Sequence, residues 1–112
     1  MPTRPFVNNN TTKVLTLTTT TSTPVLLSNP ESTKGSLRLF NNSSVLLYIA
    51  LAPTSALATA WANVPSSVTP SRSIGIPAGA VEILSFPFET TYIAGIAASG
   101  TGDLQVTEGR DN

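Results

Sequence analysis

The spacing of apolar and polar residues predicts short β-strands along most of the chain. Residues 36–40 alternate, with Leu37 and Leu39 on one face and Arg38 on the other. Residues 44–51 are almost continuously apolar, as in a strand that is buried on both faces. Because the short polar turn at 41–44 joins these two runs, they are predicted to pair as a β-hairpin.

The same reasoning extends the strands over the rest of the chain. Apolar or β-branched runs stand at 13–19, 24–27, 74–76, 80–86, 91–97 and 103–107. The glycine-rich turn at 99–102 predicts a hairpin between the last two runs. Residues 55–62 are rich in Ala and Leu, and fit either one helical stretch or a loop with a strand-like end. About seven or eight short strands predict an all-β antiparallel sandwich or jelly-roll-like fold.

Both ends of the chain are predicted to lie outside this domain, which spans 13–109. Residues 1–12 are expected to form an extended arm, because the two prolines disfavour helix and the Asn/Thr run has no apolar face. Phe6 and Val7 are the apolar side chains with which such an arm would dock on a neighbouring chain. The alternative is a frayed terminus. Residues 110–112 are expected to be a charged tail.

Charge is scarce in this sequence. It has 112 residues, 40% hydrophobic and 11% charged, with a formal net charge of zero. A typical soluble domain carries about 25% charged residues. A surface with so few charged residues predicts that a partner covers part of it, and that the chain self-associates as a homodimer or homotrimer. Nucleic-acid binding is not expected, because it requires a basic surface.

Few residues are suited to catalysis. The chain has no His and no Cys, which removes the usual base, the thiolate nucleophile and the commonest metal ligands. Glu82 and Glu89 are the nearest approach to a carboxylate pair, and Glu82 is expected to point outward from its strand. We therefore predict no enzymatic activity and no bound metal or other cofactor. The longest apolar run, 45–52, is too short to span a membrane.

The aromatic residues and the threonine tract are the candidates for binding. Trp61 fits either an interface anchor or ordinary core filling, since tryptophan is enriched at binding hot spots. With Tyr48 and Tyr92 it would also suit a sugar-stacking platform, although both tyrosines lie in apolar strands. The threonine-rich strand that starts at 13 is predicted at a sheet edge, where its lack of charge leaves it open to another chain.

The second half of the chain resembles a known family. Its order is Leu37-Arg-Leu-Phe-Asn-Asn42, an apolar strand, Ile76-Pro-Ala-Gly-Ala-Val-Glu-Ile-Leu84, and then the run from Phe88 to Gly109. It resembles small virion proteins of tailed bacteriophages, some of which are capsid decoration, or cement, proteins of short-tailed phages. The resemblance covers 36–109.

The resemblance implies a β-sandwich or jelly-roll subunit on the outside of a phage head, made in the host cytoplasm. Its partner would be the major capsid protein, and its role would be to strengthen the shell. Two alternatives remain open. One is another virion part, such as a neck, tail or fibre-base protein, and the other is a carbohydrate-binding module.

Overall fold

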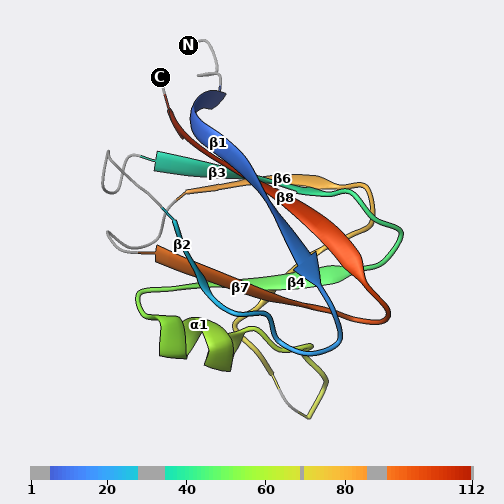
Figure 1. Ribbon diagram of the computed structural model, residues 1–112. Helices are drawn as coiled ribbons and strands as arrows, with labels where there is room; N and C mark the ends of the chain where they lie inside the picture. Colours follow the sequence, from blue (N-terminus) through green and yellow to red (C-terminus); the bar gives the residue numbers. More distant parts are fainter. Residues whose placement is uncertain (1–5, 28–34, 69, 86–90, 112) are drawn as a thin grey trace.

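The computed structural model describes residues 6–27, 35–68, 70–85 and 91–111, which form two facing four-stranded antiparallel sheets (Figure 1). Sheet A has the order β1 (Phe6–Leu17), β8 (Gly102–Asp111), β3 (Gly35–Asn41) and β6 (Val81–Ser85). Sheet B has the order β2 (Val25–Leu27), β7 (Thr91–Ala97), β4 (Leu47–Ala52) and β5 (Ile74–Ile76). The helix α1 (Ser55–Trp61) lies in the connection between β4 and β5. The predicted all-β sandwich-like architecture is confirmed.

The strand pairs are nested around that connection. β4 pairs with β5, β3 with β6, β2 with β7 and β1 with β8, so each later pair encloses the earlier one along the chain. The chain therefore has the topology of one long hairpin, in which β1 to β4 pair in turn with β8, β7, β6 and β5. Apart from the connection between β4 and β5, each connection joins a strand of one sheet to a strand of the other.

The two predicted hairpins are wrong for this reason. The strands predicted at 36–40 and 44–51 are β3 in sheet A and β4 in sheet B, and β7 and β8 are likewise in different sheets. Asn41 explains the first crossing, since its fully buried amide Nδ2 donates to the backbone oxygens of Val45 and Ile76, both at 2.8 Å. These bonds turn the chain out of sheet A and across the core.

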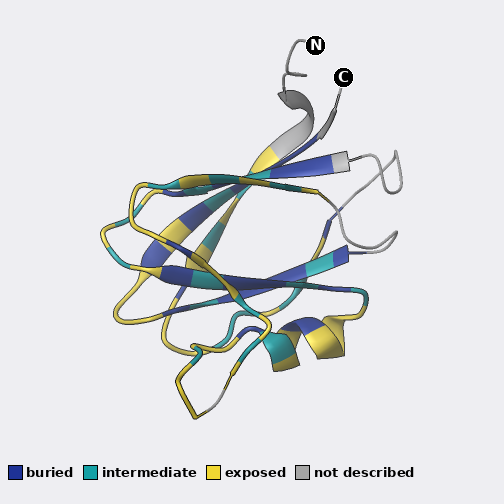
Figure 2. Cartoon of the chain, turned by 180° about the vertical axis from the view of Figure 1, so that it is seen from behind, coloured by how far each residue is buried: buried dark blue, intermediate teal, exposed yellow. Residues whose placement is uncertain are grey.

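The core lies between the sheets. The inward side chains of both are fully or almost fully buried, and Figure 2 shows these buried segments facing one another. The larger ones are Leu17, Leu37, Leu39, Leu47, Ile49, Ile76, Ile93, Leu104 and Val106. Burial of apolar area on this scale supplies most of the driving force for folding.

The helical option for residues 55–62 is confirmed. Thr54 caps α1, because its hydroxyl accepts a hydrogen bond from the backbone N–H of Leu57 at 3.2 Å. The helix covers the outer face of sheet B through a cluster of fully buried alanines. The cluster consists of Ala50 and Ala52 on β4, Ala94 on β7, and Ala58 and Ala62 at the helix.

The strands at the chain ends extend further than predicted. β1 begins at Phe6, within the predicted arm, and Phe6–Val7 pair with Asp111–Arg110 of the chain's own β8. Pairing with β8 covers Phe6 to Asn8 and resumes at Thr12, and the register shifts between these two stretches, next to the predicted end of the arm. Docking of the arm on a neighbouring chain stays a prediction, and residues 1–5 lie outside the described residues.

The last strand reaches into the predicted charged tail. β8 includes residues 110 and 111 of that tail, and Glu108, within the predicted domain, is 1% exposed. Its Oε2 lies 2.7 Å from Nζ of Lys13 on β1. Pairing with this ammonium group is what allows a carboxylate to be buried here, since an unpaired charge inside a protein is costly.

Candidate interaction surfaces

The outer face of sheet A is open, with a row of three apolar side chains and one glutamine running across the sheet. The strand register aligns Val14, Gln105, Phe40 and Val81 across β1, β8, β3 and β6. Val14 is 57% and Val81 43% exposed. Side chains opposite one another on neighbouring strands are close enough to form a continuous surface.

A second row on this face is mixed in character. It aligns Thr12, Thr107, Arg38 and Ile83, and Ile83 is 57% exposed. The Arg38 guanidinium lies 6.0 Å from the centre of the Phe40 ring, the outer limit for a cation–π contact. The combined outer face of these two rows, which we call the open face, thus presents exposed branched apolar side chains and one cation, whereas Thr107 is 7% exposed and hydrogen-bonded to Thr12.

Glu82 does not point to this face, contrary to expectation. Its register partner is Leu39, a core residue, and Leu84 on the same side of β6 packs against the core. Val81 and Ile83 instead point outward and are exposed. Side chains of β6 do alternate between the two faces, but Glu82 faces inward and its apolar neighbours face outward, the reverse of the prediction. An inward carboxylate is tolerated here because β6 is an edge strand, where Glu82 is only half-buried.

β1 gives sheet A a long free edge. The other edge strands, β2, β5 and β6, have three, three and five residues, whereas β1 has twelve. Natural edges are usually protected by shortness, charge, proline or a bulge. The register shift interrupts β1 before Thr12, but Thr12–Leu17 pairs regularly and its one charged side chain, Lys13, reaches Glu108 instead. The predicted edge position is confirmed.

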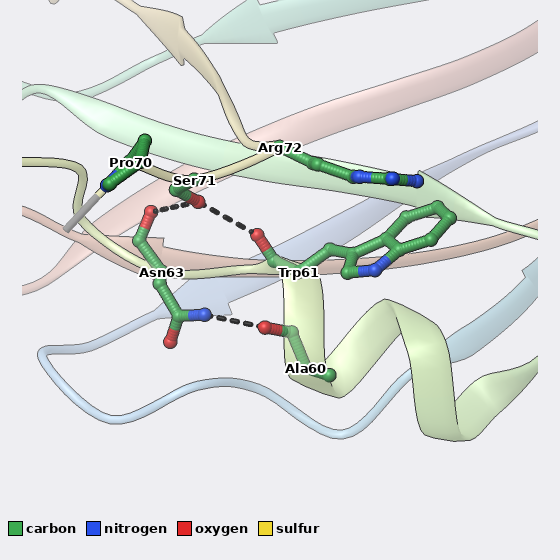
Figure 3. A pocket seen from close by; sticks show the side chains of 6 residues that line it. All are labelled: Ala60, Trp61, Asn63, Pro70, Ser71 and Arg72. Carbon is green, nitrogen blue, oxygen red and sulfur yellow. Dashed lines mark hydrogen bonds between the residues drawn. The ribbon is translucent and has the colours of Figure 1, made fainter.

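A pocket of about 330 Å³ lies beside the C-terminal end of α1, between the helix and the loop that leads to β5 (Figure 3). Its lining residues are Ala60, Trp61, Asn63, Pro70, Ser71 and Arg72. The Arg72 guanidinium lies over the Trp61 ring, 4.6 Å from its centre. This distance is well within the range of a cation–π contact.

Two serines fasten the loop to the end of the helix. The Ser71 hydroxyl lies 3.1 Å from the backbone oxygen of Trp61 and 3.2 Å from that of Asn63. The Ser73 hydroxyl donates to the same Asn63 oxygen at 2.6 Å. Arg72 lies between these two anchors, so its backbone is fixed where its side chain reaches the indole ring.

The structure does not bring the three predicted interface residues together. Phe6 and Val7 stand at the start of β1, whereas Trp61 ends α1 on the outer side of sheet B (Figure 1). Trp61 is half-buried and packs against the alanine cluster. Arg72 was missed, because a single arginine in a Pro/Ser loop carries no periodic signal; its position before Ser73 and after Ser71 became meaningful only with the fold.

Other chemical candidates contribute little to a site. Among the described residues, no group of three or more His, Cys, Asp or Glu side chains could hold a metal ion. Glu89, the other carboxylate considered with Glu82, lies outside the described residues. In the described part of the chain, no helix has the length and apolar character needed to cross a bilayer.

The chain was compared with models of known families, with curated proteins and with solved structures, and none of these comparisons gives a match.

Proposed function

We propose that this chain is a structural virion protein, a decoration protein that binds the outer surface of a bacteriophage head and stabilises it. The observation that carries the proposal is the open face of sheet A, bordered by the free edge of β1. A broad exposed surface with Val14, Val81 and Ile83 and little charge is of the kind that proteins bury against a partner.

The strand order supports a jelly-roll version of the sandwich. The order β1-β8-β3-β6 against β2-β7-β4-β5, with its nested pairs, is what a long hairpin rolled into two sheets produces. Double-sheet jelly rolls of eight strands recur in viral capsid and lectin domains. The architecture is therefore suited to a virion subunit, although a fold by itself does not assign a function.

The proposed partners are the major capsid protein and further copies of this chain. Pairing of two β1 edges would extend sheet A into a neighbouring subunit, with the exposed Val14 near the junction. A dimer formed in this way would then engage more than one capsid subunit at once. Multivalent attachment converts individually weak contacts into durable retention.

The role proposed for the chain is mechanical rather than catalytic. A subunit that binds the folded, assembled shell stabilises it by mass action, in the same way that a ligand stabilises a folded protein. The proposal predicts that heads coated with this chain withstand heating or chelation that opens uncoated heads.

Image reconstruction of the particle that carries this chain tests the proposal. We expect density for the two-sheet domain repeated over the outer capsid lattice, with sheet A towards the shell or towards a neighbouring copy. A few copies at the neck, tail or fibre base would instead favour another virion part. Absence of the chain from virions would overturn the proposal.

A further inference from the structure

We propose that the pocket lined by Trp61 and Arg72 binds an acidic side chain of a partner protein. This inference is independent of the capsid role, because it rests on the chemistry of the pocket alone. It would hold for any partner that presents an exposed Asp or Glu.

The first support is the charge of Arg72. No carboxylate in the described part of the chain lies within ion-pair distance of Arg72, whereas Lys13 is paired with Glu108. Its side chain is exposed and lies over the Trp61 ring. A guanidinium group stacked on an aromatic face still directs N–H donors outward in its own plane, where they can meet a carboxylate in a bidentate arrangement.

The second support is that the pocket is already organised for binding. The hydroxyls of Ser71 and Ser73 fix the backbone on both sides of Arg72. The indole ring then restricts the arginine side chain, and Trp61 is itself held by the alanine cluster. Ordering these groups before binding lowers the entropy that the complex would otherwise lose.

The shape and lining of the pocket favour an acidic side chain over a sugar ring. Stacking of a sugar needs a free aromatic face, and Arg72 lies over the Trp61 ring (Figure 3). The volume of about 330 Å³ is at the small end for a ligand site. Ala60 and Pro70 offer apolar contacts for the methylene groups of Glu, next to the cation that would bind its carboxylate.

The single tryptophan of the chain provides a direct readout. The indole N–H signal of Trp61 in a ¹H–¹⁵N NMR spectrum reports on this pocket alone. We would titrate the protein with the peptide acetyl-Gly-Glu-Gly-amide and, as a matched control, with acetyl-Gly-Gln-Gly-amide. We expect a saturable shift with the Glu peptide, with a Kd of about 1–10 mM, and at least roughly tenfold weaker binding of the Gln peptide.

Three variants separate this pocket from general charge attraction. Arg72→Gln should abolish the response, and Arg72→Lys should weaken it, since lysine keeps the charge but lacks the planar fork. Arg38→Gln is the matched control, because Arg38 also lies near an aromatic ring but outside the pocket. Its response should equal that of the unaltered protein, and the dispersion of all amide signals would verify that each variant is folded.

Several results would overturn the proposal. They are equal binding of the Glu and Gln peptides, an unchanged response in Arg72→Gln, an equal loss in Arg38→Gln, or no shift at all at about 30 mM peptide. A parallel titration with glucuronate, controlled by glucose, distinguishes the carbohydrate alternative. Binding of glucuronate without binding of the Glu peptide would assign the pocket to an acidic sugar instead.

Discussion

The outer faces of the two sheets differ, although both sheets bury their inner faces in the same core. Sheet B presents Ala50, Ala52 and Ala94 outward, and α1 covers them. Sheet A presents larger side chains, among them Phe40 and Ile83, and no helix of the described chain covers them. Small outward residues therefore mark the part of sheet B that α1 covers, although the same face also carries larger outward side chains, such as Tyr48 and the exposed Leu26.

The difference follows from packing distance. A helix approaches a sheet closely where small residues meet, which is why the alanines of β4, β7 and α1 are fully buried. Branched side chains on sheet A would hold a helix away, but they offer a large apolar area to a separate partner. Four variants, from the largest expected effect on stability to the smallest, test this contrast.

Asn41→Ala should have the largest effect, because it removes the side chain that directs the chain from one sheet to the other. The buried backbone oxygen of Ile76 loses its amide donor, at about 1–3 kcal/mol for an unsatisfied buried group, whereas that of Val45 keeps the Ser43 hydroxyl at 3.3 Å. Urea unfolding measures the loss. Asn42→Ala, at the exposed next position, is the control, and an equal loss there would contradict the role of Asn41.

Ala50→Leu tests the covered face by overfilling it. We expect a loss of about 1–3 kcal/mol, since the larger side chain must displace α1 or the alanines opposite. Ser85→Leu makes a similar enlargement at an exposed end of β6 and should change the free energy of unfolding little. Equal effects of the two substitutions in thermal unfolding would mean that the faces do not differ as described.

Thr54→Ala weakens the element that covers sheet B without altering the sheet. Loss of the hydrogen bond to the Leu57 N–H should cost about 1 kcal/mol. Ser55→Ala, one residue further along and inside the exposed first turn, is the control. A larger loss at Ser55 than at Thr54, measured by chemical unfolding, would contradict the assigned cap.

Ile83→Thr should have the smallest effect on stability, within about 0.5 kcal/mol, because the side chain is exposed on the open face. Its proposed importance lies in binding, so the same variant should be retained less well on phage heads. A marked fall in melting temperature would show that Ile83 packs within its own domain.

Local patterns were sufficient for most strands and offered the helix as one of two options, but they did not give the pairing of the strands. The sequence pattern of the runs at 36–40 and 44–51 is the same whether the turn between them closes a hairpin or carries the chain to the other sheet. The hydrogen bonds of the buried Asn41 side chain favour the crossing. The bond to Ile76 joins residues 35 positions apart, whereas the bond to Val45 spans only four. Burial of Glu108 was hidden for the same reason, because its partner Lys13 is at the opposite end of the chain.

The candidate surfaces were predictable to a similar extent. The edge position of the strand that starts at residue 13 could be inferred from composition, because the strand is rich in threonine and carries little charge. The phase of β6, and with it the outward position of Val81 and Ile83, required the register with β3. The contact of Arg72 with Trp61 required the loop geometry set by Ser71 and Ser73.

Hydrogen–deuterium exchange of the free and the head-bound protein tests the central claim most directly. The account predicts slower exchange on binding for amides of Thr12–Leu17 in β1 and of β6, because a partner covers the open face and the free edge of sheet A. The central amides of β4 and β7, already paired within sheet B, should be unchanged. Bound protein in which β1 and β6 exchange as fast as in the free protein would contradict the account.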